Sequence, residues 1–132
     1  MSHRMIGVFR ADSSRFNLTA EQVEQGLGRL SFAGAQPHVE RRDETHTALQ
    51  WDTTQTEYDF QRVVLDDGIV LIEGDRPYVA KLVVAIRQLF DPDAADVWVG
   101  NPGQGLGRVL RADDEASDVF QDWQDLPLDQ FS

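Results

Sequence analysis

The chain of 132 residues contains no cysteine, which excludes disulfide bonds, thiol nucleophiles and thiolate metal sites together. Its stability must therefore come from packing of the 41% of residues that are hydrophobic. No apolar run approaches the roughly 18 residues that a membrane-spanning helix needs. Met1–Met5 lacks the apolar core of a secretory signal. These absences lead us to expect a cytoplasmic protein with no membrane role.

Lysine is nearly absent as well, because eleven of the 12 basic residues are arginine and Lys81 is the one lysine. The 23 acidic residues outnumber the basic ones and give a formal net charge of −11. Affinity for nucleic acid comes largely from lysine and arginine on phosphates, so this charge argues against direct nucleic-acid binding. The same field attracts a basic protein surface and speeds its encounter with the chain.

The negative charge is concentrated in the last 21 residues, Ala112 to Ser132, which carry seven acids and no base. Apolar side chains are threaded through these acids, so the segment is amphipathic rather than merely solvating. They are Val119, Phe120, Trp123, Leu126, Leu128 and Phe131. We therefore expect an α+β domain over residues 1–111 and an acidic amphipathic segment over residues 112–132, packed on the same domain.

Two helix starts are indicated by capping signals. Thr19 and Gln22 form a T-x-x-Q capping box, which predicts the start of the first helix. Asp75 as the cap, with Pro77 in the first turn, predicts a second helix. Tyr78–Phe90 is apolar almost all round, so this second helix is the predicted core helix.

The strands are indicated by a change of period. Residues 37–73 alternate between apolar and polar side chains, which predicts three or four antiparallel strands, and Asp66-Asp67-Gly68 predicts a hairpin turn. Met5–Arg10 and Asp96–Val99 predict one strand before the first helix and one after the second. The expected order is β-α-β-β-β-β-α-β. It predicts a two-layer α+β sandwich, with a mainly antiparallel or mixed sheet and two principal helices on one face.

Motifs for catalysis or cofactors are weak. Gly100–Gly107 follows a predicted strand, but it matches neither G-x-G-x-x-G nor a P-loop, so we interpret it as a flexible connector. His38, Glu44 and His46 have even spacings that suit a metal site on paired strands, yet surface histidines in a polar hairpin are the commoner explanation. We predict no catalytic residue, no cofactor and no metal.

The C-terminal segment supports two compatible interpretations, a short amphipathic helix docked on its own domain or a segment that docks on a partner. The leading hypothesis is a noncatalytic acidic protein-binding module, an inhibitor or immunity-type protein that covers a basic surface of a toxin or nuclease. Finding the contact residues paired within the protein would overturn it. The expected contacts are Asp113, Asp114, Glu115, Asp118, Asp122, Trp123 and Asp125.

Two alternatives from other classes remain open. One is a small enzyme or ligand-binding protein with a pocket near Gly100–Gly107, which predicts a concave site with converging polar groups. The other is a structural or assembly homodimer, formed through strands around His38–Trp51 or through exchanged C-terminal segments.

Overall fold

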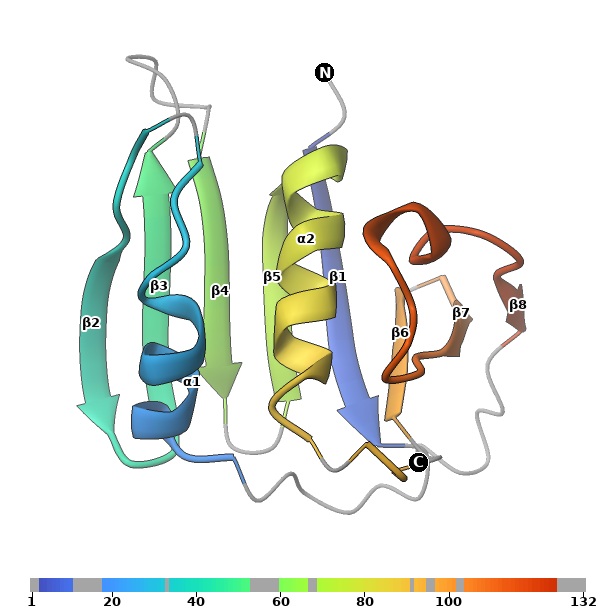
Figure 1. Ribbon diagram of the computed structural model, residues 1–132, viewed down its shortest axis with the longest axis horizontal. Helices are drawn as coiled ribbons and strands as arrows, with labels where there is room; N and C mark the ends of the chain where they lie inside the picture. Colours follow the sequence, from blue (N-terminus) through green and yellow to red (C-terminus); the bar gives the residue numbers. More distant parts are fainter. Residues whose placement is uncertain are drawn as a thin grey trace.

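The computed structural model describes residues 3–10, 18–32, 34–52, 60–66, 69–90, 92–94, 97–101 and 104–125. Eight strands form one antiparallel sheet, and two helices pack against it (Figure 1). This confirms the α+β class and the mainly antiparallel sheet. From one edge to the other, the strands are β2 (His38–Asp43), β3 (His46–Asp52), β4 (Phe60–Asp66), β5 (Ile69–Asp75), β1 (His3–Arg10), β6 (Val97–Asn101), β7 (Leu106–Val109) and β8 (Gln124–Asp125).

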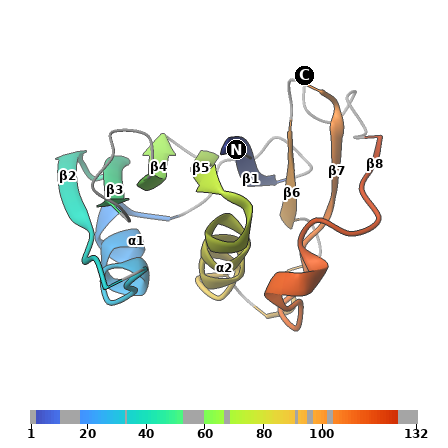
Figure 2. The same cartoon turned by 90° about the horizontal axis from the view of Figure 1, so that it is seen from above.

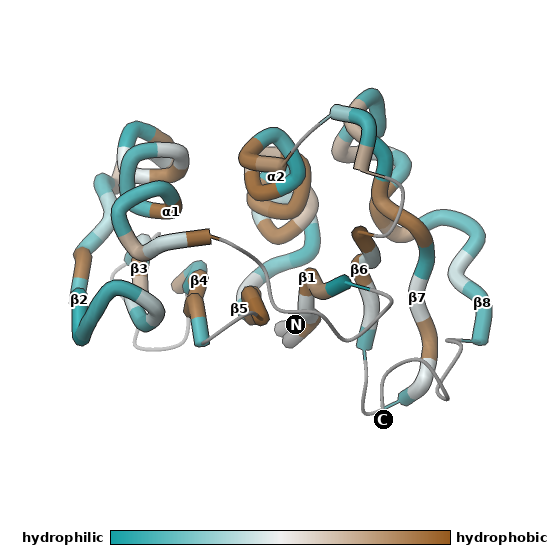
Figure 3. The backbone as a smooth tube through the Cα atoms, turned by 90° about the horizontal axis from the view of Figure 1, so that it is seen from below, coloured by the Kyte–Doolittle hydropathy of each residue, from teal (hydrophilic) through white to brown (hydrophobic). Residues whose placement is uncertain are grey.

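Helices cover one face of this sheet. α1 (Ala20–Leu27) contacts β3 and β2, and α2 (Arg76–Arg87) lies over β5 and β1. Seen along the sheet, both helices and the 3-10 helix η1 (Ala116–Asp118) lie on the same side (Figures 2 and 3). Among the described residues, no helix is long and apolar enough to cross a membrane.

The core forms between the helices and the alternate strand residues that face them. Leu49, Val63 and Ile72 are fully buried on three neighbouring strands, because odd and even positions of a strand point to opposite faces. The indole Nε1 of Trp51 donates a hydrogen bond to the Leu30 carbonyl oxygen at 2.8 Å. Period-two alternation therefore places one residue in two against the helices and leaves the others on the open face.

The two helix starts differ in how they are capped. The Thr19 hydroxyl accepts a hydrogen bond from the Gln22 N–H at 3.2 Å, and the Gln22 side chain accepts one from the Thr19 N–H at 2.9 Å, which confirms the predicted capping box. Asp75 stands at the N-cap of α2, but its side chain makes no capping hydrogen bond. Its backbone N–H instead donates to Oε1 of the buried Gln61 at 2.8 Å.

The β4–β5 hairpin pairs Asp66 with Ile69, as the turn sequence predicts, while the turn residues 67–68 lie outside the described part of the chain. Before it, β2 and β3 form a second hairpin around Glu44 and Thr45. The sequence also offers a turn near Asp52–Thr56, which falls mostly on residues 53–59, outside the described part of the chain.

The glycine-rich stretch corrects the expected order of elements. In the described residues, three strands follow α2 where the sequence predicts one. Gly100–Gly107 holds the end of β6, a turn and the start of β7 rather than a flexible connector, and β8 comes from the acidic C-terminal segment. Gly100 pairs with Gly107, and a Cβ atom at Gly100 would lie 2.5 Å from the Leu106 carbonyl oxygen. Close approach of the two strands thus requires glycine at Gly100.

Candidate functional site

The acidic C-terminal segment folds back on its own domain as far as the structure describes it, to Asp125. After β7 the chain makes a short 3-10 helix, η1 (Ala116–Asp118), in place of the amphipathic α-helix considered from the sequence. Asp122 then takes a positive φ of 57°, which turns the chain into the edge strand β8. There Gln124 pairs with Gly107 of β7.

Apolar contacts attach this segment to α2. Val119 is fully buried, and η1 contacts α2. The guanidinium carbon of Arg76, at the start of α2, lies 4.8 Å from the centroid of the partly buried Phe120 ring. Phe120 and Trp123 are tilted neighbours with ring centroids 5.7 Å apart, and Trp123 Nε1 donates to the Val119 carbonyl oxygen at 2.7 Å. One aliphatic side chain therefore anchors the segment, and an aromatic pair lies partly exposed beside it.

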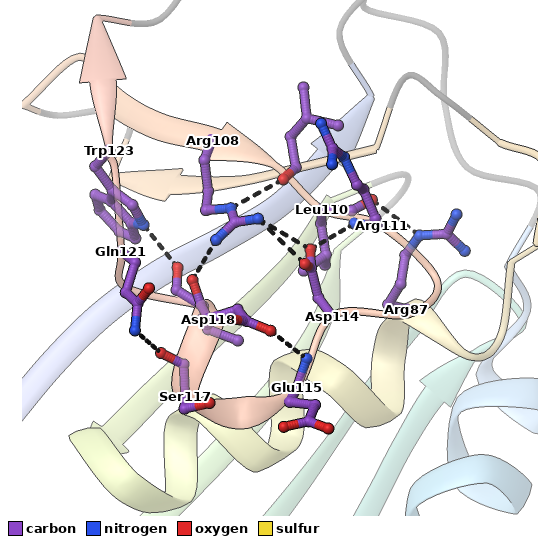
Figure 4. A network of polar contacts seen from close by, with 12 residues as sticks. Arg87, Arg108, Leu110, Arg111, Asp114, Glu115, Ser117, Asp118, Gln121 and Trp123 are labelled. Carbon is purple, nitrogen blue, oxygen red and sulfur yellow. Dashed lines mark hydrogen bonds and ion pairs between the residues drawn. The ribbon is translucent and has the colours of Figure 1, made fainter.

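Arg108 on β7 makes polar contacts with two residues of the segment (Figure 4). It lies on the helix-bearing face because it is opposite the buried Val99. Its Nη2 is 3.2 and 3.3 Å from the two carboxylate oxygens of Asp114, and its Nη1 donates to the Asp118 carbonyl oxygen. Asp114 also accepts the Arg111 N–H at 2.7 Å. The carboxylate of Asp114 is thus paired within the protein, which argues against its predicted contact with a partner.

Asp118 and Glu115 stabilise the start of η1. The Asp118 carboxylate accepts the Glu115 N–H at 2.9 Å, and the Asp118 N–H donates to the Glu115 carbonyl oxygen at 2.9 Å. Glu115 is exposed, whereas Asp118 is partly buried. The Asp118 carboxylate is therefore also occupied within the protein, whereas the Glu115 side chain faces solvent.

The remaining predicted acids face solvent. Asp113, Asp122 and Asp125 are exposed and, among the described residues, form no ion pair or side-chain hydrogen bond. Trp123 is partly buried. The segment that carries these side chains wraps the end of the sheet formed by β6, β7 and β8 (Figure 1). Its acids thus separate into Asp114 and Asp118, which hold the segment, and others that are open to a partner.

Two residues essential to this arrangement have no linear signal. Arg108 is separated from Asp114 by the chain reversal after β7, and Arg76 is separated from Phe120 by the rest of α2 and the β6–β7 hairpin. Local sequence patterns detect neighbours three or four residues apart on a helix, or two apart on a strand. Neither contact belongs to those classes, so sequence reasoning missed both.

A hollow of about 440 Å³ lies on the open face over β2, β3 and β4. Ala48 and Val64 are register partners lining it, while Arg42 and Arg62 add positive charge and Glu40 adds negative charge. His46 and Asp66 complete its charged lining. Charges of both signs alternate around an apolar floor, so the hollow selects neither an anion nor a cation.

A second hollow, of about 520 Å³, lies beside the buried Arg87 near Pro92 and Arg111. Arg87 Nε donates to the Leu110 carbonyl oxygen at 3.0 Å, and its Nη2 donates to that of Ala94 at 2.9 Å. This guanidinium therefore joins the end of α2 to the segments that follow it. Neither hollow is lined by residues of the Gly100–Gly107 hairpin, where the ligand-binding alternative expects a pocket.

The two histidines considered for a metal site lie at opposite ends of the β2–β3 hairpin. His38 pairs with Gln50 near one end of β2, whereas His46 begins β3 at the other end of that hairpin. The nitrogens of His46 contact carboxylates of Asp43 and Asp66 rather than His38 and Glu44. The described residues contain no group of three or more ligands arranged to hold a metal ion.

Comparison of the chain with protein-family models, curated proteins and solved structures finds no match in any of the three. Function is therefore inferred from the chemistry of the chain itself.

Proposed function

We propose that the protein is a noncatalytic acidic protein-binding module, an inhibitor or immunity-type protein that covers a basic surface of its partner. One observation carries the proposal. The C-terminal segment carries both exposed carboxylates and a partly buried aromatic pair, while a separate set of acids holds the segment to the domain. The exposed ones are Asp113, Glu115, Asp122 and Asp125.

The division of roles supports binding in two ways. The Arg108–Asp114 pair orders the segment before any partner arrives, which lowers the entropy lost on association. The exposed carboxylates, added to the net charge of −11, attract a cationic surface and raise the association rate. Trp123 supplies apolar area on the same segment as those charges, as the anchor residue of an interface does.

The homodimer alternative is not supported by the edge that it would use. All six residues of β2 are exposed, but four of them, Glu40–Asp43, are charged, and the register shifts between Arg41 and Asp43. Charged side chains and bulges on an edge strand oppose edge-to-edge pairing of sheets. A cytoplasmic location stays a prediction from the sequence.

The test compares two variants with the same change of charge. Asp113→Asn, Glu115→Gln, Asp122→Asn and Asp125→Asn together neutralise the proposed surface, and a control variant neutralises four exposed acids elsewhere, Glu21→Gln, Glu40→Gln, Glu44→Gln and Asp52→Asn. Proteins captured from native lysate by the unmodified chain are identified and then titrated against each variant.

We expect a basic partner whose association rate falls about tenfold or more with the surface variant and much less with the control, with the difference reduced by added salt. An equal fall of the association rate in the two variants would mean that net charge alone, and not the C-terminal surface, attracts the partner. A captured partner that is acidic, or that binds both variants as it binds the unmodified chain, contradicts the proposal.

A further inference from the structure

His46 lies between two carboxylates that come from different strands. Its Nδ1 is 2.8 Å from Oδ1 of Asp43 at the end of β2, and its Nε2 is 3.2 Å from Oδ1 of Asp66 at the end of β4. The imidazole therefore connects the β2–β3 hairpin to β4. This cluster lies in the β2–β4 part of the sheet, away from the β6–β8 end that carries the C-terminal segment.

Both contacts require an N–H from the ring. A neutral imidazole carries one N–H, whereas an imidazolium carries two, and an ionised carboxylate only accepts hydrogen bonds. Both contacts of His46 are thus hydrogen bonds only when the ring is protonated. In the neutral ring, one nitrogen lone pair faces a carboxylate oxygen, which is repulsive. Where that nitrogen is Nδ1, it can accept a hydrogen bond from the Thr45 hydroxyl, 2.9 Å away, in place of donating one to Asp43.

Asp43 is held in its ionised form. The hydrogen bond from His46 lowers the pKa of Asp43 from 3.8 to about 2, with a further contribution from the Thr45 N–H, which donates to Oδ1 at 2.8 Å. This carboxylate therefore remains an acceptor throughout the range in which a histidine titrates.

The ring is accessible to protons, since its side chain is 33% exposed. Other charged groups line the hollow that it borders, which are Glu40, Arg41 and Arg42 from the β2 side and Arg62 from β4. The three arginines oppose protonation of the ring, whereas Glu40 and the two carboxylates in direct contact with the ring favour it.

We propose that His46 is a pH-dependent contact between the edge hairpin β2–β3 and the end of β4. The protonated ring strengthens the pairing of β3 with β4 at this end, and the neutral ring strengthens it less. A group that gains partners on protonation contributes stability below its ordinary pKa, about 6.5 for histidine, and loses it as the pH rises through its folded-state value. The hairpin is therefore held more firmly in mildly acidic solution than in alkaline solution.

The first test is a proton NMR titration of the histidine ring signals in the full chain. In Asp66→Asn the titration midpoint of His46 falls by a few tenths of a pH unit, the scale of an exposed ion pair. The matched control, Asp52→Asn, removes an exposed acid from the other end of β3 and leaves the midpoint in place. An unchanged midpoint in Asp66→Asn, or an equal fall in the control, overturns the proposal.

The second test measures local opening of the β2–β3 hairpin by amide hydrogen exchange. Comparison at one pH removes the intrinsic pH dependence of exchange. Around Thr45, exchange in Asp66→Asn is faster than in the unmodified chain at about pH 5, and the two rates converge at about pH 8, either side of the ordinary histidine pKa. A difference of the same size at both values would mean that protonation does not operate the contact.

Discussion

Arg108 and Asp114 are joined across the chain reversal that follows β7, with Nη2 of the arginine 3.2 and 3.3 Å from the two carboxylate oxygens. Their side chains are only 18% and 9% exposed, so solvent screens the pair weakly. This contact, together with the bond from Arg108 to the Asp118 carbonyl oxygen, fixes the path of the acidic segment on the domain.

Replacement of Asp114 by alanine is expected to destabilise the fold by about 1–3 kcal/mol, because it leaves the partly buried Arg108 without its carboxylate. Chemical denaturation measures the loss. Asp113→Ala is the matched control, since Asp113 is an exposed neighbour, and its expected effect is within about 0.5 kcal/mol. Equal effects of the two substitutions would show that the pair does not hold the segment.

Val119→Ala is expected to cost about 1–2 kcal/mol, because Val119 is fully buried and its truncation leaves a cavity under the C-terminal segment. The comparison is Val39→Ala on the edge strand β2, where the side chain is 44% exposed and little area is lost. Thermal unfolding of both variants gives the difference. A Val119 variant as stable as the Val39 variant would mean that the segment contributes nothing to the core.

Gly100→Ala is expected to weaken the fold by about 1–3 kcal/mol, the scale of an overpacked site. Its new Cβ would lie 2.5 Å from the Leu106 carbonyl oxygen and 3.0 Å from the Gly107 Cα, so β6 and β7 must separate. Gly7→Ala is the control, because the nearest atom to its Cβ, in Phe9, lies at an ordinary 3.6 Å. Urea unfolding of the two variants distinguishes them, and a milder effect at Gly100 than at Gly7 would contradict the close pairing of β6 with β7.

The lowered pKa of Asp43 predicts that the stability of the fold depends on pH in acidic solution. Because its folded-state pKa is lowered to about 2, its stabilising contribution is present above its ordinary value of 3.8 and is lost as the pH falls through about 2. The unmodified chain is therefore more stable than Asp43→Asn above that window, and the gap narrows as the pH is lowered through it. Denaturation curves of both proteins across this range check the sign. A gap that widens on acidification would contradict it.

Local interactions account for the parts of the structure that the sequence predicts well. The capping box of Thr19 and Gln22 joins residues three apart, and the β4–β5 hairpin follows from a turn between two strands of alternating pattern. Neither depends on a distant segment. The exposed acids Asp113, Asp122 and Asp125 were likewise placed on the surface by composition alone, since unpaired carboxylates are rarely buried.

By itself the sequence determined the α+β class, the first helix start, the antiparallel hairpins and the acidity of the C-terminal segment, all of which depend on neighbouring residues or on composition. Only the tertiary structure decided that Arg108 pairs with Asp114 and that Gly100 packs against Leu106. It also decided that His46 lies between Asp43 and Asp66. Strand pairing and chain reversal bring these groups together. Such contacts join residues from different strands and turns, whose pairing no local periodicity encodes.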